Sequence, residues 1–395
     1  MVDRLEYIQT RREQAYVKHY VLKNYLQQLA LKIGNFKNGT TINYIDGFSG
    51  PWQQATEDLR DTSPHIALTE LRLARQVLAE QANPRNLNIR AMFVENDTDA
   101  FELLQQIPAQ FSEIECETYP GQFEGRIEEA RRFATKGPTP FAFIFIDPTG
   151  WTGYGLQAIS PLLQVRPSEV LINFMTKDIT RFVDDTDSTA LRSFIDLFGD
   201  PNYREAWRGL EGIEREDAIV TAYCDRIRRA GGFKHCVATI ILNAKRDRTH
   251  YHLVYATRSI QGLITFRDTE RKAVPEQRDI RADAKQRDRV ARGQQEMFSA
   301  PVMETSYMAE LQARNQQRAR DEIIAILQPE VEVDYDLIVA SALQHPMTSV
   351  SDLRCWIKAW LEEKSIEVIG LQGGERALAV SRRHRLRKRP GRTLR

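Results

Sequence analysis

Residues 141–150 read FAFIFIDPTG, the most apolar short run of the chain, which ends in an acid, a proline and a glycine. A continuous apolar run of this length, bounded by turn-forming residues, predicts a β-strand that is buried on both faces. Strands of this kind are typical of parallel sheets that helices cover on both sides. The stretch therefore predicts the centre of an α/β fold.

Shorter strand-like segments alternate with helical segments on either side of this run. The other expected strands read TINYID, IRAMFVE, EIECETYP and PSEVLINF, at residues 41–46, 89–95, 113–120 and 167–174. The expected helices cover residues 14–33, 63–78, 98–107 and 124–133, and Ser63 is expected to cap the second of them. Right-handed crossovers place the carboxyl ends of parallel strands at one edge, where such sheets bind ligands. We therefore expect a Rossmann-like α/β domain over residues 40–175.

The pattern loosens after residue 180 into helices and loops, an excursion that extends to about residue 232. Two further apolar segments, residues 237–242 and 251–257, are expected to form an antiparallel hairpin that completes the sheet. The first domain is then expected to span residues 1–265.

Three further parts follow this domain. Residues 266–317 are crowded with Arg, Asp, Glu and Lys and predict an exposed, charged helical linker. Residues 318–381 carry three helical patterns and then IEVIGLQGGERALAV, two short strands around a Gly-Gly turn, which are the parts of a winged helix. Residues 382–395, RRHRLRKRPGRTLR, hold eight Lys or Arg and no acid. This basic tail favours a polyanion such as nucleic acid, and a solvated end without a partner is the alternative.

The composition indicates a soluble globular protein, with 42% hydrophobic and 28% charged residues and a net charge of +1. No apolar run approaches the ~18–20 residues that a membrane span requires, and the N-terminus lacks the apolar core of a secretory signal. We therefore expect a cytoplasmic protein without membrane contact. The four cysteines are scattered, which favours buried reduced thiols over disulfides or a zinc site. His250 and His252 lie two apart without a third ligand in view, so we expect structural histidines.

The first strand leads into a loop that carries Asp46, Gly47, Phe48 and Gly50. The glycines permit a turn in which the backbone approaches a ligand closely. In a domain that binds S-adenosylmethionine (SAM), this loop wraps the methionine part of the cofactor, and its acid can meet the amino group. A purely structural turn is the alternative that the motif leaves open.

The next two strand ends complete the expected SAM site. Glu95 ends the second strand, where an acid can accept hydrogen bonds from both ribose hydroxyls, as in other nucleoside-binding Rossmann folds. After the third strand, Gln122 and Phe123 offer an amide and a ring to the adenine. Together with the first loop, these residues predict SAM as the cofactor.

Asp147, Pro148 and Trp151 follow the fourth strand at the same edge. An exocyclic amine is a poor nucleophile because its lone pair is delocalised into the base. A carboxylate and a backbone carbonyl that accept its two hydrogens return the lone pair to the nitrogen, and a ring can stack a flipped base. We therefore expect Asp147 and Pro148 to orient the nucleophile and Trp151 to stack the substrate. A buried strand that ends in an Asx-Pro turn is the structural alternative.

Lys18, on the first expected helix, carries a long cationic side chain near this edge. It is expected to reach a phosphate of the substrate or the carboxylate of the cofactor. An ordinary solvated lysine is the alternative.

The chain resembles the three-Cys-motif partner (TcmP) family over residues 10–265. The resemblance rests on motifs that occur in one order, namely Lys18 with Leu22 and Tyr25-Leu26, YIDGFSGP, Thr62-Ser63-Pro64 with Ala67, FVEND and FIDPTG. It implies a Rossmann-like SAM-dependent methyltransferase fold, similar in particular to enzymes that act on adenine N6 of ribosomal RNA. It also implies a bacterial origin and a partner protein that bears a three-cysteine motif.

One motif departs from the pattern of nucleic-acid amino-methyltransferases, which usually read Asp/Asn-Pro-Pro followed by an aromatic residue. Here Thr149 replaces the second proline, Gly150 stands at the aromatic position, and Trp151 follows one residue late. We expect a SAM-dependent methyltransferase that acts on an exocyclic amine of DNA or RNA together with a three-Cys-motif protein. The alternative is a non-catalytic, methyltransferase-like adaptor that binds nucleic acid or a partner protein.

Overall fold

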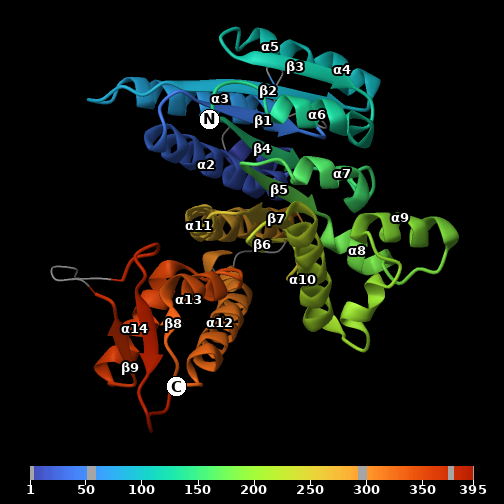
Figure 1. The fold of residues 1–395 in the computed structure, drawn as a ribbon. Helices are drawn as coiled ribbons and strands as arrows, with labels where there is room; N and C mark the ends of the chain where they lie inside the picture. Colours follow the sequence, from blue (N-terminus) through green and yellow to red (C-terminus); the bar gives the residue numbers. More distant parts are fainter. Residues whose placement is uncertain (1–3, 51–58, 292–299, 372–377, 395) are drawn as a thin grey trace.

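The computed structural model describes residues 4–50, 59–291, 300–371 and 378–394. A seven-stranded sheet forms the centre, in the order β3-β2-β1-β4-β5-β7-β6 (Figure 1). The strands are β1 (Thr40–Asp46), β2 (Leu87–Glu95), β3 (Glu115–Pro120), β4 (Pro140–Ile146), β5 (Ser168–Phe174), β6 (His235–Leu242) and β7 (Thr249–Thr257). The predicted central strands and the final hairpin are confirmed.

The sheet is mostly parallel. β1 pairs in parallel with β2 and β4, β2 with β3, and β4 with β5, whereas β7 is antiparallel to both β5 and β6. Because β1 has β2 on one side and β4 on the other, the strand order reverses beside it. In open α/β sheets the carboxyl ends of the strands at such a switch point form the ligand-binding crevice.

Two hydrophobic cores lie on opposite faces of the sheet because successive side chains of a strand alternate in direction. In β4, Phe143 and Phe145 enter one core, whereas Ile144 and Ile146 enter the other. All seven positions of β1 are buried, as expected for a strand with helices on both faces.

Each core is closed by its own layer of helices. The first layer consists of α1 (Arg4–Gln9), α2 (Glu13–Phe36), α3 (Ser63–Ala79), α4 (Thr98–Leu104), α5 (Gln106–Ala109) and α11 (Ile260–Ala291). The second consists of η1 (Phe123–Arg126), α6 (Ile127–Ala134), α7 (Leu156–Leu163), α8 (Thr176–Phe182), α9 (Ser188–Phe198), η2 (Tyr203–Trp207) and α10 (Gly212–Gly231). The last four of these form the expected helical excursion, which is confirmed.

The predicted cap of α3 is wrong by one residue. The hydroxyl of Thr62, not that of Ser63, accepts a hydrogen bond from the backbone N–H of His65, at 3.5 Å. The hydroxyl of Ser63 instead donates to the carboxylate of Asp46, at 2.8 Å. The hydroxyl of Ser63, which the sequence pattern assigned to the cap of α3, therefore binds Asp46 instead.

The prediction of an exposed linker after residue 265 is wrong for its first part. Residues 260–291 form α11, which packs along α2 and the β6–β7 hairpin. Arg267 has a fully buried side chain that donates to the carbonyl of Ala238 at 2.9 Å, to the carbonyl of Leu343 at 2.9 Å and to Glu270 at 2.7 Å. These hydrogen bonds explain how the guanidinium of Arg267 can be buried, since its donors have partners.

The C-terminal module lies beyond the β6 side of the sheet (Figure 1). It contains α12 (Ala300–Leu327), β8 (Val333–Asp334), α13 (Tyr335–Ala342), α14 (Val350–Glu362), β9 (Ile366–Ile369) and β10 (Arg385–Lys388). The three strands form an antiparallel sheet in the order β8-β10-β9. The Gly-Gly turn falls at residues 372–377, outside the described residues. The second strand of the hairpin begins at Arg385, later than predicted.

The predicted basic tail is not a solvated end, because β10 is the middle strand of this small sheet. Leu386 is fully buried in the core. The cations beside it pair within the module: Arg385 with Glu332, at 3.0 Å, and Lys388 with Glu330, at 3.0 Å. Acidic side chains of the same module thus neutralise charges that the sequence pattern assigned to a polyanion.

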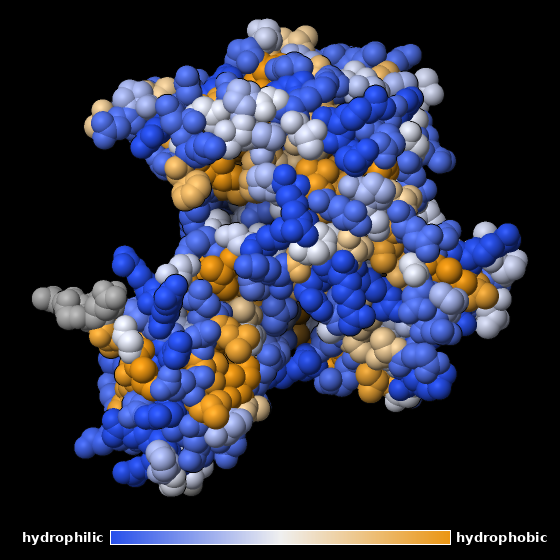
Figure 2. Space-filling view, in the orientation of Figure 1, coloured by the Kyte–Doolittle hydropathy of each residue, from blue (hydrophilic) through white to orange (hydrophobic). Residues whose placement is uncertain are grey.

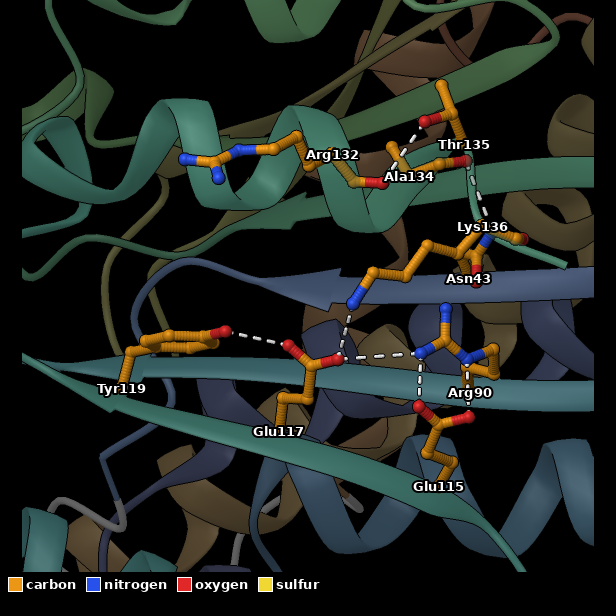
Figure 3. A network of polar contacts seen from close by, with 9 residues as sticks. All are labelled: Asn43, Arg90, Glu115, Glu117, Tyr119, Arg132, Ala134, Thr135 and Lys136. Atoms are coloured by element: carbon orange, nitrogen blue, oxygen red, sulfur yellow. Dashed lines mark hydrogen bonds and ion pairs between the residues drawn. The ribbon is translucent and has the colours of Figure 1, made fainter.

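The outer strand β3 carries a polar network on one of its faces (Figure 3). Nε of Arg90 donates to Glu115 at 2.7 Å, while Glu117 accepts from Lys136 at 2.9 Å and from the hydroxyl of Tyr119 at 2.7 Å. Charged side chains along an edge strand disfavour pairing with the strand of another molecule. The network therefore disfavours the addition of a further strand at β3, the edge of the sheet opposite the β6–β7 hairpin.

The visible surface is mostly hydrophilic, and apolar patches are prominent over the C-terminal module (Figure 2). Large exposed apolar residues of this module are Val331, Leu337, Leu361 and Leu371. Among the described helices, none is both long and apolar enough to cross a membrane. The four cysteines are free, as expected; Cys224 and Cys236 are buried, whereas Cys116 is only half-buried and Cys355 is exposed.

Candidate active site

The carboxyl ends of β1, β4 and β5 face the first turns of α2 across a cavity of about 350 Å³. Its walls include Lys18, His19, Phe48, Gly50, Asp147 and Asn173. The cavity therefore lies at the switch point beside β1, where parallel-sheet geometry predicts a ligand.

Asp147 is held from two sides. One carboxylate oxygen accepts from the ammonium of Lys18, and the other accepts from Nδ2 of Asn173 at 2.7 Å. The side chains of Lys18 and Asp147 are only 14% and 11% exposed. A carboxylate oxygen has more than one acceptor position, so Asp147 can still receive a donor from the cavity. Two residues singled out from distant parts of the sequence are thus in contact, and Pro148 lines the cavity beside them.

Asp46 lies beneath the first loop and does not line the cavity. It is fully buried and accepts hydrogen bonds from the backbone N–H of Phe48 at 3.1 Å, the hydroxyl of Ser63 at 2.8 Å and the hydroxyl of Tyr44 at 3.2 Å. Burial raises the pKa of its carboxyl to about 7, against these hydrogen bonds, which lower it. The carboxyl holds the loop in shape, whereas the sequence predicted a direct contact with the cofactor.

Glu95 also fastens the loop. Its carboxylate accepts from the backbone N–H of Asp97 at 2.7 Å, and a hydrogen bond from the N–H of Gly50 lowers its pKa, although burial has the larger effect and raises it. The residue is 5% exposed and sits at the end of β2, as predicted. Glu95 and the glycine loop are therefore one unit of structure.

Phe123 and Gln122 occupy different environments. The ring of Phe123 is buried and covers Gly47, where an added Cβ would lie 2.7 Å from the ring. Gly47 is thus required by a close contact with a side chain of this protein. Gln122 is exposed. Neither residue lines the cavity, so the predicted adenine contact stays a prediction.

Trp151 is not brought to the cavity. Its indole N–H donates to the hydroxyl of Ser193 at 2.9 Å, and its ring stacks on Phe194 with 5.2 Å between centroids. Phe182 packs against it at 5.5 Å. The ring thus anchors the helical excursion in this geometry, and the rings that line the cavity include those of Phe48, His250 and Tyr251 instead.

Sequence reasoning gave no site role to several residues of the cavity, among them His19, Asn173 and His250, the last of which was expected to be structural. Nδ1 of His250 is buried without a hydrogen-bond partner among the described residues, and burial lowers the pKa of the imidazole to about 4. Asn173 was detectable, since it follows the apolar run of the fifth strand at the ligand edge. His252, by contrast, has the structural role expected of it, because its Nδ1 bonds to Thr176 at 2.7 Å.

The fold and the site define an α/β protein with a polar cavity at the carboxyl edge of a mostly parallel sheet. No family model matches the sequence, and no curated protein matches it either. Among solved structures, the chain is similar to protein LPL1258 from Legionella pneumophila, of family model DUF519. The TM-score is 0.32 and the identity is 10%, over 61% of this chain and 85% of that chain.

Proposed function

We propose that the protein is a SAM-dependent methyltransferase that acts on an exocyclic amine of nucleic acid. The observation that carries the proposal is the carboxylate of Asp147, held by Lys18 and Asn173 at the wall of a cavity that the glycine loop also borders. An acid followed by proline at the end of the fourth strand suits the activation of an amine, because both offer acceptors to its hydrogens.

The topology supports the same proposal. A seven-stranded sheet in the order β3-β2-β1-β4-β5-β7-β6, with β7 antiparallel, is the arrangement that Rossmann-like methyltransferases share. The donor set fits SAM in part: Phe48 and Gly50 would hold the methionine portion, and Glu95 would receive the ribose. SAM supplies an electrophilic methyl group when bound. The ring of Phe123, which covers Gly47, is the part of the site that does not fit SAM in this geometry.

The residues of the chain then have distinct tasks. Lys18 and Asn173 fix the carboxylate of Asp147, so that its free acceptor positions face the cavity. Asp147 and the carbonyl of Pro148 accept the two hydrogens of the amine and localise its lone pair. The interaction strengthens as positive charge develops on the nitrogen, which is the condition for lowering the barrier.

The nitrogen must also lose a proton. His250 is a neutral imidazole in the cavity, because burial lowers its pKa to about 4. The nitrogen carries a positive charge once it has taken the methyl group, and this cation is a strong acid because loss of its proton restores delocalisation of the lone pair into the base, so a weak base is sufficient to accept the proton. His250 is therefore the proposed acceptor.

The C-terminal module supports nucleic acid as the substrate. Its helices α12, α13 and α14 and its sheet in the order β8-β10-β9 have the element order of a winged helix, with α14 in the position of the recognition helix. We propose this module as a second contact with the substrate. A three-Cys-motif protein remains the proposed partner, on the sequence resemblance alone.

A methyl-transfer screen tests the proposal. Purified full-length protein would be incubated with tritiated SAM and, separately, DNA, ribosomal RNA, transfer RNA and protein extract. We expect incorporation into one nucleic acid, and loss of it in Asp147→Ala. Incorporation into protein alone, or into nothing, would contradict the proposal.

The second candidate function is that of an adaptor without catalysis. It is favoured by the ring of Phe123 over Gly47 and by the engagement of Trp151 with Phe194, which leave two expected ligand contacts unmade. A thermal melt with SAM separates the two. A ligand at ~100 times its dissociation constant stabilises by about 2.7 kcal/mol, and an unchanged melt in millimolar SAM favours the adaptor.

A further inference from the structure

A second, larger cavity of about 950 Å³ lies on the other side of α2. It is a groove between α2 and α3, closed by residues of α1 and α11, and His19 lines both this groove and the candidate active site. Its volume falls in the range of small-molecule sites. The groove therefore adjoins the place where the reacting group is proposed to lie.

Glu70 forms part of the groove wall and has an unmet hydrogen-bonding requirement. The residue is only 4% exposed, and its Oε2 has no hydrogen-bond partner within the described residues. Its Oε1 lies 3.5 Å from the ammonium of Lys23, which also lines the groove. A buried acceptor without a partner is unfavourable by more than an ordinary hydrogen bond contributes. A ligand with N–H donors would satisfy it.

Aromatic rings stand beside this pair. Tyr16 and Tyr20 both line the groove, with 6.3 Å between ring centroids. The hydroxyl of Tyr16 donates to Glu276 at 2.7 Å, which fixes the first ring. Half-buried rings in a polar groove are the surface on which unpaired bases stack.

We propose that the groove binds an unpaired guanine nucleotide of the substrate, next to the nucleotide that enters the active site. The inference rests on the proposed function, because the groove adjoins that site at His19. The Watson–Crick edge of guanine presents O6 as an acceptor and N1–H and N2–H as donors. Lys23 donates to O6, and Glu70 accepts from both N–H groups. Adenine, cytosine and uracil cannot make this set of three contacts.

Binding of single nucleotides to the full-length protein tests the inference without any need for methyl transfer. Calorimetric titrations with GMP, AMP, CMP and UMP are expected to show GMP binding about 5- to 150-fold more tightly than the others, the range for one good base contact. Equal affinities for GMP and UMP would overturn the inference. An arginine-containing peptide that displaces GMP completely and binds more tightly would also overturn it, in favour of a protein ligand.

Two variants locate the binding. Glu70→Gln is expected to weaken GMP about 10- to 100-fold and to leave UMP nearly unchanged, since hydrogen bonds to a charged group are lost. Tyr20→Leu is expected to weaken all four nucleotides alike, by about 5- to 150-fold, through lost stacking. The exposed Glu102→Gln serves as a matched control, and melts of each variant verify folding. A folded Glu70→Gln protein with full GMP affinity would overturn the assignment.

The outcomes separate this inference from the function on which it rests. If SAM-dependent methyl transfer occurs but GMP has no preference, the groove proposal fails alone. If GMP binds with dependence on Glu70 while no substrate is methylated, the groove proposal stands and the catalytic one fails.

Discussion

The buried carboxyl of Asp46 should make the stability of the protein depend on pH in a direction that the structure determines. Burial raises the pKa of this carboxyl from 3.8 to about 7. Between these pH values the folded protein holds a proton that the unfolded chain releases. The stability from the protonated carboxyl is therefore fully present below pH 3.8 and is lost as the pH rises through about 7.

The substitution Asp46→Asn removes this ionisation and keeps the size of the side chain. A rise in pKa from 3.8 to about 7 corresponds to at most about 4 kcal/mol, since one pKa unit is worth about 1.4 kcal/mol. Between pH 5 and pH 8 the part that titrates amounts to roughly 2–3 kcal/mol. Any penalty from altered hydrogen bonds with Tyr44 and Ser63 is the same at every pH.

Urea denaturation of both proteins at pH 5, 6, 7 and 8 measures the effect. We expect the stability of the wild type relative to the variant to fall by roughly 2–3 kcal/mol across this range. His19, His250 and His252 have lowered pKa values and destabilise the fold as the pH falls, but they are present in both proteins and cancel. A difference that stays flat from pH 5 to pH 8 would refute the reasoning.

Four further outcomes can be measured. Asp147→Ala should keep the SAM-induced rise in melting temperature and slow methyl transfer about 100- to 1,000-fold, and wild-type rates would exclude the proposed mechanism. Glu95→Ala should lower stability and abolish the SAM-induced rise, whereas Glu95→Gln should restore most of the stability but not the rise; retention of the rise in both would remove this residue from the cofactor site. Arg267→Met should destabilise by about 3–5 kcal/mol, because it leaves a buried carboxylate unpaired, against about 0.5 kcal/mol or less for the exposed Arg271→Met, and equal effects would contradict the burial argument. Deletion of residues 382–395 should unfold the C-terminal module as seen by proteolysis, and an intact module would show that β10 is dispensable.

The sheet could be predicted because its strands are decided by local pattern. Runs such as FAFIFI are apolar on both faces, and only a strand covered from both sides buries them fully. The position of Asp147 at the ligand edge followed from the same rule, since parallel strands bring their carboxyl ends to one edge, whereas its contact with Lys18 of α2 was not predicted. What the rule did not provide was the partner of each side chain.

The role of a polar or aromatic residue depends on which side chains contact it, and some of these side chains come from distant segments. Asp46 was expected to face the ligand, but its buried carboxylate accepts hydrogen bonds from the hydroxyls of Ser63 and Tyr44. Trp151 was expected to face the substrate, but Phe194 of the helical excursion takes its ring. Ser63 and Phe194 lie far along the chain from the residues that they contact, so no local sequence pattern predicts these two contacts, whereas Tyr44 lies only two residues before Asp46.

Charge-rich segments misled the prediction for one physical reason. A run of Arg, Asp and Glu is normally solvated, because burial of an unpaired charge is costly. The buried charges of α11 and β10 have partners, Arg267 pairing with Glu270 and Lys388 with Glu330, and both segments can therefore pack. Composition reports how many charges a segment carries, whereas burial depends on whether each charge finds a partner.

Helix α2 joins the two proposed sites, and its periodicity explains how. Residues three and four apart share a face of a helix, so Tyr16, Tyr20 and Lys23 all line the groove, whereas Lys18 points to Asp147 on the other side. His19 lies between these faces and borders both cavities. A substrate that placed one nucleotide in each cavity would therefore straddle one rigid helix. The separation of the two nucleotides would then be set by the helix itself, which makes α2 the element that selects which nucleotide beside the guanine can react.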